Sequence, residues 1–185
     1  MSKVFLISDP HFDHEKIIEF GGRPYESIEE MNESLIEKWN RTVTKNDMVI
    51  CLGDWGWRGQ KSYEYAKRLN GKIRLVMGNH DSGNIKSLIN NFHSVHGSLK
   101  KGRLLLTHIP IVYDKYRMWD YIVHGHIHRE EDGIKDFRYI NVNMDVWDRT
   151  EKYAPIPLEE VHALIEEREL AHMYNTTLRT YDGTV

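Results

Sequence analysis

The sequence has one cysteine, Cys51, in 185 residues, and no apolar segment approaches the roughly 20 residues that a membrane-spanning helix needs. A disulfide framework and a zinc site built from thiolates are therefore excluded, and any metal must bind through oxygen and nitrogen. The apolar run from Val4 to Ile7 is too short for the core of a signal peptide, so we expect a soluble, cytoplasmic protein. The formal charge of −3 provides no global attraction to nucleic acid or to anionic lipid.

Length and composition are those of one globular domain, with 40% hydrophobic and 29% charged residues. The segment 171–185 is polar and weakly patterned, and it is predicted to be a tail of uncertain order or an oligomer arm after a domain that spans residues 1–170. Short apolar segments alternate with helical patterns, which indicates the α/β class.

The predicted helices include one that begins after Ser27, with Ile28, Met31, Leu35 and Trp39 on one face. The other predicted helices are Lys61 to Leu69, Ile85 to Asn91 and Leu158 to Leu170. Ser94 to Leu99 and Arg103 to Thr107 flank Lys100-Lys101-Gly102, which predicts a β-hairpin. The remaining predicted strands are Val4 to Ile7, Met48 to Leu52, Ile73 to Met77, Tyr121 to Val123 and Phe137 to Val142.

Five of these strands end within about two residues of a histidine, an aspartate or both. Ligands of α/β sheets bind where the loops at the carboxyl ends of the strands converge, so the five polar clusters are expected at one edge. In chain order the clusters are Asp9-Pro10-His11, Gly53-Asp54, Gly78-Asn79-His80-Asp81, His108 and His124-Gly125-His126-Ile127-His128.

Carboxylates, neutral imidazoles and one amide oxygen are the ligands of a hard-to-borderline metal pair. Two metal ions need a ligand that bridges them, and Asp54 is the candidate because a carboxylate has two oxygens. Each cluster alone also fits a turn or a packed histidine. The five clusters together, each at a strand end, favour a metal site.

The motifs D-x-H, G-D, G-N-H-D, H and G-H-x-H occur in the order that identifies the calcineurin-like metallophosphoesterase family. The opening resembles the small bacterial and phage predicted phosphoesterases of this family through the stretch from Ser8 to His14, followed by Ile17-Ile18, Arg23-Pro24 and Glu29-Glu30-Met31-Asn32. The resemblance implies a four-layer α/β/β/α sandwich of two mixed sheets flanked by helices. It also implies one metal ion held by Asp9, His11, Asp54 and His128, and a second held by Asp54, Asn79, His108 and His126.

In that family the histidine at the position of His80 stabilises the transition state or protonates the leaving oxygen, and a carboxylate, here Asp81 or Asp54, orients it. Asn79, His80 and Arg23 are expected to contact the substrate, although Arg23 equally fits a surface salt bridge. His14 fits a supporting role better than direct contact with substrate. Trp55 and Trp57 could stack on a nucleobase, and core packing is expected for at least one of them.

These observations predict a phosphoester hydrolase that uses metal-activated hydroxide on a small phosphodiester or phosphomonoester. A diester is favoured, and a nucleotide-derived diester is the candidate substrate. Two divalent ions are expected, and sequence does not choose among manganese, iron, nickel and zinc. A nuclease is disfavoured because basic residues occur only as scattered pairs. A catalytically silent metal-binding module would be expected to lack ligands, and none is missing. No membrane partner is predicted, and the oligomeric state is left open.

Overall fold

The computed structural model describes residues 2–57, 60–81, 85–113 and 118–181, and its strands form two sheets. The five-stranded sheet has the order β4 (Ser94–His96), β3 (Lys72–Val76), β2 (Met48–Cys51), β1 (Val4–Ile7) and β9 (Ile156–Pro157). The four-stranded sheet has the order β5 (Leu99–Lys101), β6 (Leu104–Leu106), β7 (Tyr121–His124) and β8 (Tyr139–Asn141). Each sheet is parallel except for one antiparallel edge strand, β9 or β5. The predicted fold of two mixed sheets flanked by helices is thus confirmed.

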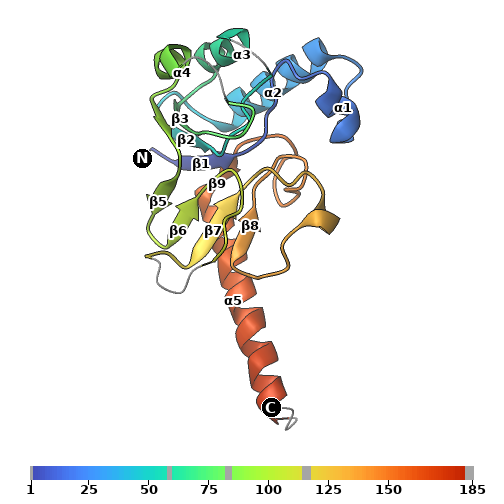
Figure 1. Cartoon of the computed structure of the whole chain (residues 1–185), viewed down its shortest axis with the longest axis vertical. Coiled ribbons are helices and arrows are strands. Elements are labelled where there is room, and N and C mark those ends of the chain that lie inside the picture. The colour runs from blue at the N-terminus through green and yellow to red at the C-terminus, as the bar shows by residue number, and fades with distance from the viewer. Residues whose placement is uncertain (1, 58–59, 82–84, 114–117, 182–185) are drawn as a thin grey trace.

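Alternating residues of the strands belong to two separate hydrophobic cores. In β1, Phe5 and Ile7 pack with the helices that cover the five-stranded sheet, whereas Leu6 packs between the sheets against residues such as Val123 and Ile140. This alternation follows from the period of two in a strand. The covering helices lie above the five-stranded sheet in Figure 1 and are α1 (Lys16–Phe20), α2 (Ile28–Thr42), α3 (Gln60–Glu64), the 3-10 helix η1 (Tyr65–Arg68) and α4 (Ile85–Asn91).

Helix α2 begins where its capping residues predicted. The Ser27 side chain accepts a hydrogen bond of 3.1 Å from the Glu30 amide, and the Glu30 carboxylate accepts one from the Glu26 amide. The apolar face of α2 is buried at Met31, Leu35 and Trp39. This cap and stripe anchor the helix on the outer face of the sheet.

The segment expected to be one strand from Ser94 to Leu99 is divided between the two sheets, which corrects the predicted hairpin. Strand β4 pairs with β3, and the chain then crosses at Gly97–Ser98 to β5, which pairs with β6. Lys100 and Lys101, expected in the turn, therefore lie in β5, and Gly102 makes the turn with a φ of 57°. The sequence could not predict this division, because both halves of the segment favour a strand. The halves differ only in the strand with which each one pairs.

Three further elements differ from the expectation. Helix α1 and strand β9 were not predicted, and the helix expected at Lys61 to Leu69 divides into α3 and η1. Proline in β9 fits an edge strand, where no ladder hydrogen bond is needed from it. A second 3-10 helix, η2, covers Glu130–Asp132.

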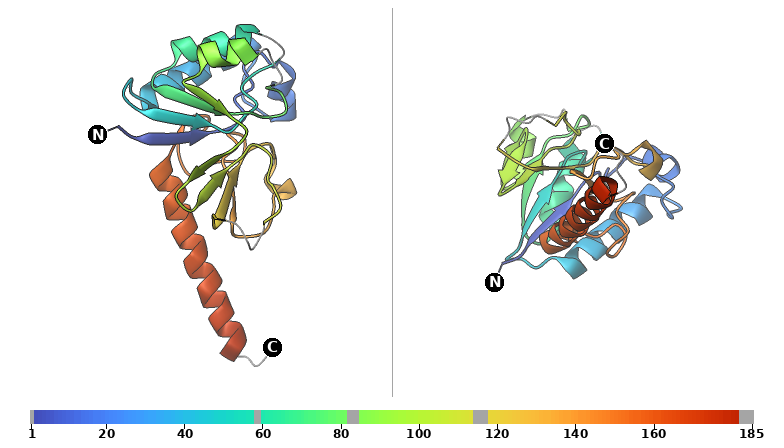
Figure 2. Two further views of the ribbon diagram at one scale, coloured as in Figure 1. Left: turned by 60° about the vertical axis from the view of Figure 1, so that its left-hand side comes forward. Right: turned by 90° about the horizontal axis from the view of Figure 1, so that it is seen from below.

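Helix α5 (Leu158–Tyr181) runs past residue 170, where the tail was expected to begin, without a break. Leu158, Val161 and Ile165 join the core between the sheets, and Arg168 and His172 still contact Tyr139 and Phe137. Only the C-terminal part of the helix extends away from the body of the molecule (Figures 1 and 2). Within the ranges that the structure describes, no helix combines the length and apolar character needed to cross a bilayer.

Candidate metal centre

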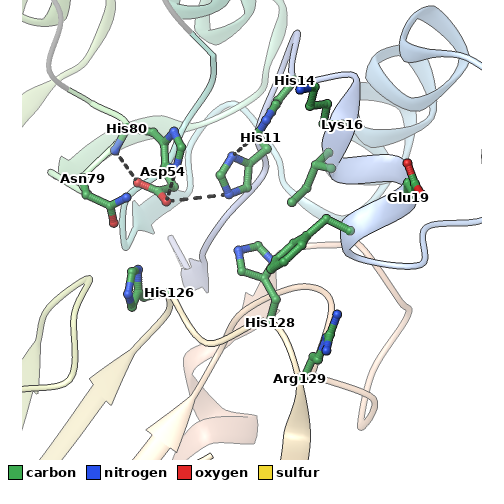
Figure 3. Close-up of a pocket in the computed structure, with 12 residues that line it drawn as sticks. His11, His14, Lys16, Glu19, Asp54, Asn79, His80, His126, His128 and Arg129 are labelled. Atoms are coloured by element: carbon green, nitrogen blue, oxygen red, sulfur yellow. Dashed lines mark hydrogen bonds and ion pairs between the residues drawn. The ribbon is translucent and has the colours of Figure 1, made fainter. Parts of the chain in front are cut away.

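The loops that follow the parallel strands of both sheets bring the predicted ligands to one edge (Figure 3). Asp9, His11 and His128 form one group whose ligand atoms lie within 4.8 Å of one another. Asp54, His108 and His126 form a second group by the same measure, and Asn79 lies beside it with Oδ1 3.0 Å from His108 Nε2. We call these the first and the second cluster.

Four of the six non-glycine residues with positive φ in the described part of the chain are predicted ligands: Asp9 (61°), His11 (52°), Asp54 (51°) and His126 (67°). A left-handed conformation costs on the order of 1–3 kcal/mol at a non-glycine residue, and such strain is typical of functional sites. Main-chain hydrogen bonds hold the strained turns together, from the Asp9 amide to the Gly53 carbonyl and from the His11 amide to the Asp54 carbonyl, each 3.0 Å.

Glycine is required where the chain comes closest to the ligands. A Cβ at Gly78 would lie 2.2 Å from Asp54 Oδ1, and one at Gly125 would lie 2.3 Å from Asp9 Oδ2. The expectation of close backbone approach beside the ligands is therefore confirmed at these two positions.

The second cluster gathers acceptor atoms around a common point. His108 Nδ1 lies 2.8 Å from the Leu52 carbonyl oxygen and must donate to it, so in the neutral ring the lone pair is on Nε2. That nitrogen faces Asn79 Oδ1 at 3.0 Å and Asp54 Oδ2 at 3.3 Å. Burial lowers the pKa of His108, but the Asp54 carboxylate outweighs it and leaves the pKa raised. A cation among these three atoms, either a proton or a metal ion, satisfies all of them.

The first cluster attracts positive charge in the same way. His128 Nδ1 lies 2.7 Å from Asp145 Oδ2, and its Nε2 lies 3.4 Å from Asp9 Oδ1. Burial lowers the pKa of His128, yet hydrogen bonds with Asp145 and Asp9 raise it to about 9. His11 Nε2 is buried without a hydrogen-bond partner, 3.9 Å from Asp9 Oδ1. A divalent cation would satisfy this orphaned nitrogen, because histidine ligands bind metals through such a lone pair.

Asp54 lies between the clusters. Its Oδ2 is 3.7 Å from His11 Nε2 of the first cluster and 3.3 Å from His108 Nε2 of the second. Burial raises the pKa of Asp54, but hydrogen bonds with His108 and the His80 amide leave it lowered, so the carboxylate is ionised at neutral pH. The nitrogen and oxygen ligands of both clusters fit a pair of divalent ions.

His80 reaches the site, and its companion carboxylate is Asp54 rather than Asp81. His80 Nε2 lies 3.8 Å from Asp54 Oδ2, and the side chain is 30% exposed. Asp81 is fully buried and accepts hydrogen bonds from the amides of Asp54, Trp55 and Gly78. Burial raises the pKa of Asp81 to about 6. The expected catalytic role of Asp81 is therefore corrected to a positioning role in the loop that carries Asp54.

The expected contact of Arg23 with substrate is wrong. Its guanidinium is buried and donates to both carboxylate oxygens of Asp145, to the carbonyl oxygens of Asp9 and Pro10 and to Met31 Sδ. All five N–H groups are occupied, so none is available to a phosphate. Asp145, which sequence analysis missed, links Arg23 to His128. Strand β8 ends at Asn141, so Asp145 lies beyond the limit of about two residues that found the other strand-end residues.

His14 supports the first cluster, as expected. Its Nδ1 lies 3.2 Å from His11 Nδ1, and its ring stacks on Trp57 with centroids 4.1 Å apart. Burial lowers the pKa of His14 to about 4, so the ring is neutral and can accept the His11 Nδ1 proton, leaving His11 Nε2 for a metal. Trp55 is fully buried in the core, which confirms core packing for one of the two tryptophans.

A pocket of about 880 Å³, the central pocket, opens over both clusters. His11, Asp54, Asn79, His80, His126 and His128 line one side of it (Figure 3). Helix α1 and the segment after His128 supply the other side with Lys16, Glu19, Phe20 and Arg129, which sequence analysis missed because α1 was not predicted.

Comparisons with known proteins agree with this geometry. The family model of the calcineurin-like phosphoesterases matches residues 2–178. An uncharacterized protein of Methanocaldococcus jannaschii is 31% identical over 95% of this chain and 98% of its own. The Gene 66 protein of Mycobacterium phage D29 is 26% identical over 91% of this chain and 98% of its own. The crystal structure of a protein of unknown function from Aquifex aeolicus superimposes with a TM-score of 0.70 and 26% identity over 89% of this chain and 100% of that one. The chain belongs to the calcineurin-like phosphoesterase family, whose members are metal-dependent hydrolases of phosphoesters.

Proposed function

We propose that this protein hydrolyses a phosphodiester, nucleotide-derived, with two divalent ions bound in its two clusters. Asp9, His11, Asp54 and His128 hold one ion, and Asp54, Asn79, His108 and His126 hold the other. The observation that carries the proposal is the position of Asp54 Oδ2, within 3.7 Å of His11 Nε2 and 3.3 Å of His108 Nε2. One carboxylate within reach of both clusters is the feature that a binuclear site needs.

When bound, a pair of divalent ions lowers the pKa of water toward about 7 and neutralises charge on a phosphate. The residues of the chain supply the remaining functions. Asp54 and Asp9 set the charge of the site, and the hydrogen bonds that His128 and His108 donate to Asp145 and Leu52 fix the two rings. His80, exposed to the central pocket beside Asp54, delivers a proton to the leaving oxygen. A positioned acid of this kind contributes roughly 10²- to 10⁴-fold to the rate.

A diester is favoured over a monoester because two pockets meet at the candidate site. Asn79 lines the central pocket and also a second pocket of about 520 Å³, beside His108. A phosphodiester carries two ester groups, and each pocket can receive one of them. Lys16 and Arg129 in the central pocket add attraction for an anion, opposed by Glu19.

The test is a substrate panel with protein reconstituted separately with manganese, iron, nickel and zinc. Bis(4-nitrophenyl) phosphate, 4-nitrophenyl phosphate, cyclic nucleotides and single-stranded DNA are compared by kcat/KM, and bound metal is counted by mass spectrometry. We expect two ions per chain and the highest kcat/KM on a small diester. Two bound ions without turnover of any substrate would instead support a silent binding module, and a preference for DNA would support a nuclease.

A further inference from the structure

The pocket beside His108 differs chemically from the central pocket. Its walls include the apolar side chains of Met77, Leu105, Ile109, Ile111 and Trp119, and we call it the apolar pocket. No Lys, Arg, Asp or Glu is among the residues that line it in the described ranges, whereas Lys16, Glu19 and Arg129 line the central pocket. The apolar pocket therefore suits an uncharged group.

Two residues that line the apolar pocket each carry a buried polar atom for which the described part of the chain offers no hydrogen-bond partner. Trp119 Nε1 and Thr107 Oγ1 are both buried without a hydrogen bond, and Thr107 is only 6% exposed. Buried polar groups almost always have a hydrogen-bond partner, and an indole N–H can act only as a donor. Pairing these atoms takes a ligand that carries polar atoms of its own, because a purely hydrocarbon group offers neither a donor nor an acceptor.

The apolar pocket is also joined to the candidate site. Asn79 and His108 belong to its lining and to the second cluster, so a group in this pocket can be bonded to a phosphate at the metal centre. The isoleucines at its rim are partly exposed, Ile109 by 49% and Ile111 by 41%. Apolar walls with a few placed polar groups are typical of sites for small ligands.

From these observations we infer that the apolar pocket binds the nucleobase of the diester, an uncharged planar ring with hydrogen-bond acceptors. The base lies between apolar side chains and accepts a hydrogen bond from Trp119 Nε1, and Thr107 Oγ1 pairs with a second polar atom of the ring. This inference rests on the proposed function for the position of the phosphate. The pocket and its unpaired atoms are independent of that function.

The first experiment compares two diesters that share a leaving group, thymidine 5′-(4-nitrophenyl) phosphate and methyl 4-nitrophenyl phosphate. We expect wild-type protein to prefer the thymidine ester. The ratio of the two kcat/KM values should fall about tenfold in Trp119→Phe and in Thr107→Val, which keep shape and remove the polar atom. Ile111→Trp, which fills the rim, should lower the ratio as well. The control is Val112→Trp, next along the chain, 89% exposed and outside the pocket lining, which should leave the ratio unchanged.

A ratio that none of the pocket variants changes would overturn the inference. A ratio lowered by Phe20→Ala and not by Trp119→Phe would overturn it too, because the base would then lie in the central pocket. Both results leave the proposed hydrolase intact, whereas absence of turnover on both diesters contradicts the proposed function alone.

A second experiment does not depend on turnover. Thymidine and adenosine, which lack a phosphate, are titrated into the full chain by calorimetry. Binding of either that weakens about tenfold in Trp119→Phe supports the inference. Absence of binding by both nucleosides, or binding that Trp119→Phe leaves unchanged, contradicts it.

Discussion

The two clusters contain similar ligands but are supported in different ways. In the first cluster, His128 is held by Asp145, and Asp145 is held by the buried guanidinium of Arg23, 122 positions away in the chain. In the second cluster, His108 donates to the main-chain oxygen of Leu52, and Asp81 fixes the Asp54 loop by accepting from the amides of Asp54 and Trp55. The first cluster thus depends on a chain of side-chain ion pairs, and the second on hydrogen bonds that each involve a main-chain group.

This difference shows which residues outside the ligand set position the ligands and can be tested by substitution. A main-chain acceptor such as Leu52 cannot be removed by substitution, whereas a chain of ion pairs can be broken at a residue that touches neither metal nor substrate. Asp54 belongs to the second cluster but reaches the first. The following predictions test how far the two clusters are independent.

The largest effect is expected from Asp54→Ala, because one side chain serves both clusters. Both ions should be lost together, and turnover should fall to background. Metal content by mass spectrometry and kcat on a diester measure the two effects, with the exposed Asp148→Ala as the control. A variant that retains one tightly bound ion would show that the clusters do not share Asp54.

His80→Ala should separate chemistry from metal binding. The His80 side chain borders both clusters, 3.8 Å from Asp54 and with its ring centroid 5.1 Å from that of His11, but it belongs to neither group. We expect kcat to fall by about 10²- to 10⁴-fold while two ions remain bound. The exposed His93→Ala should change neither quantity. Loss of metal in His80→Ala would identify His80 as a ligand.

Arg23→Leu should weaken the first cluster alone. Removing one partner of a buried ion pair costs about 3–5 kcal/mol, and here Asp145 loses two hydrogen bonds from Arg23 and keeps only His128 as a partner. We expect a drop of that size in the free energy of unfolding by urea titration, and weaker binding of one ion of the two. The matched control is Arg149→Leu, which breaks the exposed pair with Glu167 and should cost less than about 1 kcal/mol. Equal weakening of both ions would contradict the separation of the clusters.

The smallest effect concerns backbone strain at the rim of the second cluster. His126 has a φ of 67°, so in metal-free protein His126→Gly should be more stable than His126→Ala by about 1 kcal/mol. At His128, which is not among the residues with positive φ, the order should be reversed, with alanine equal to or more stable than glycine. Thermal unfolding of the four variants measures both differences. The same order at the two positions would mean that the strain at His126 does not affect stability.

The candidate ligands were predictable because each follows a strand. Apolar runs identify strands, and the carboxyl ends of parallel strands share an edge, so Asp9, Asp54, Asn79, His108 and His126 could be grouped from sequence. Arg23 was misassigned because its partner, Asp145, lies far away in the chain. Phe20 and Arg129 were missed because nothing local marks a side chain as lining a pocket. Trp119 and Thr107 were not predicted as pocket residues for the same reason.

The sequence by itself determined the fold class, the two-sheet architecture through its family motifs, and the identity of the residues that meet at the strand ends. Periodicity and motif spacing are local properties, so they can be recognised in the sequence alone. Only the tertiary structure decided that Asp54 lies within reach of both clusters, that Arg23 is buried against Asp145, and that a pocket with largely apolar walls adjoins the site. Those features depend on which distant side chains come into contact, and a linear pattern carries no information about such contacts.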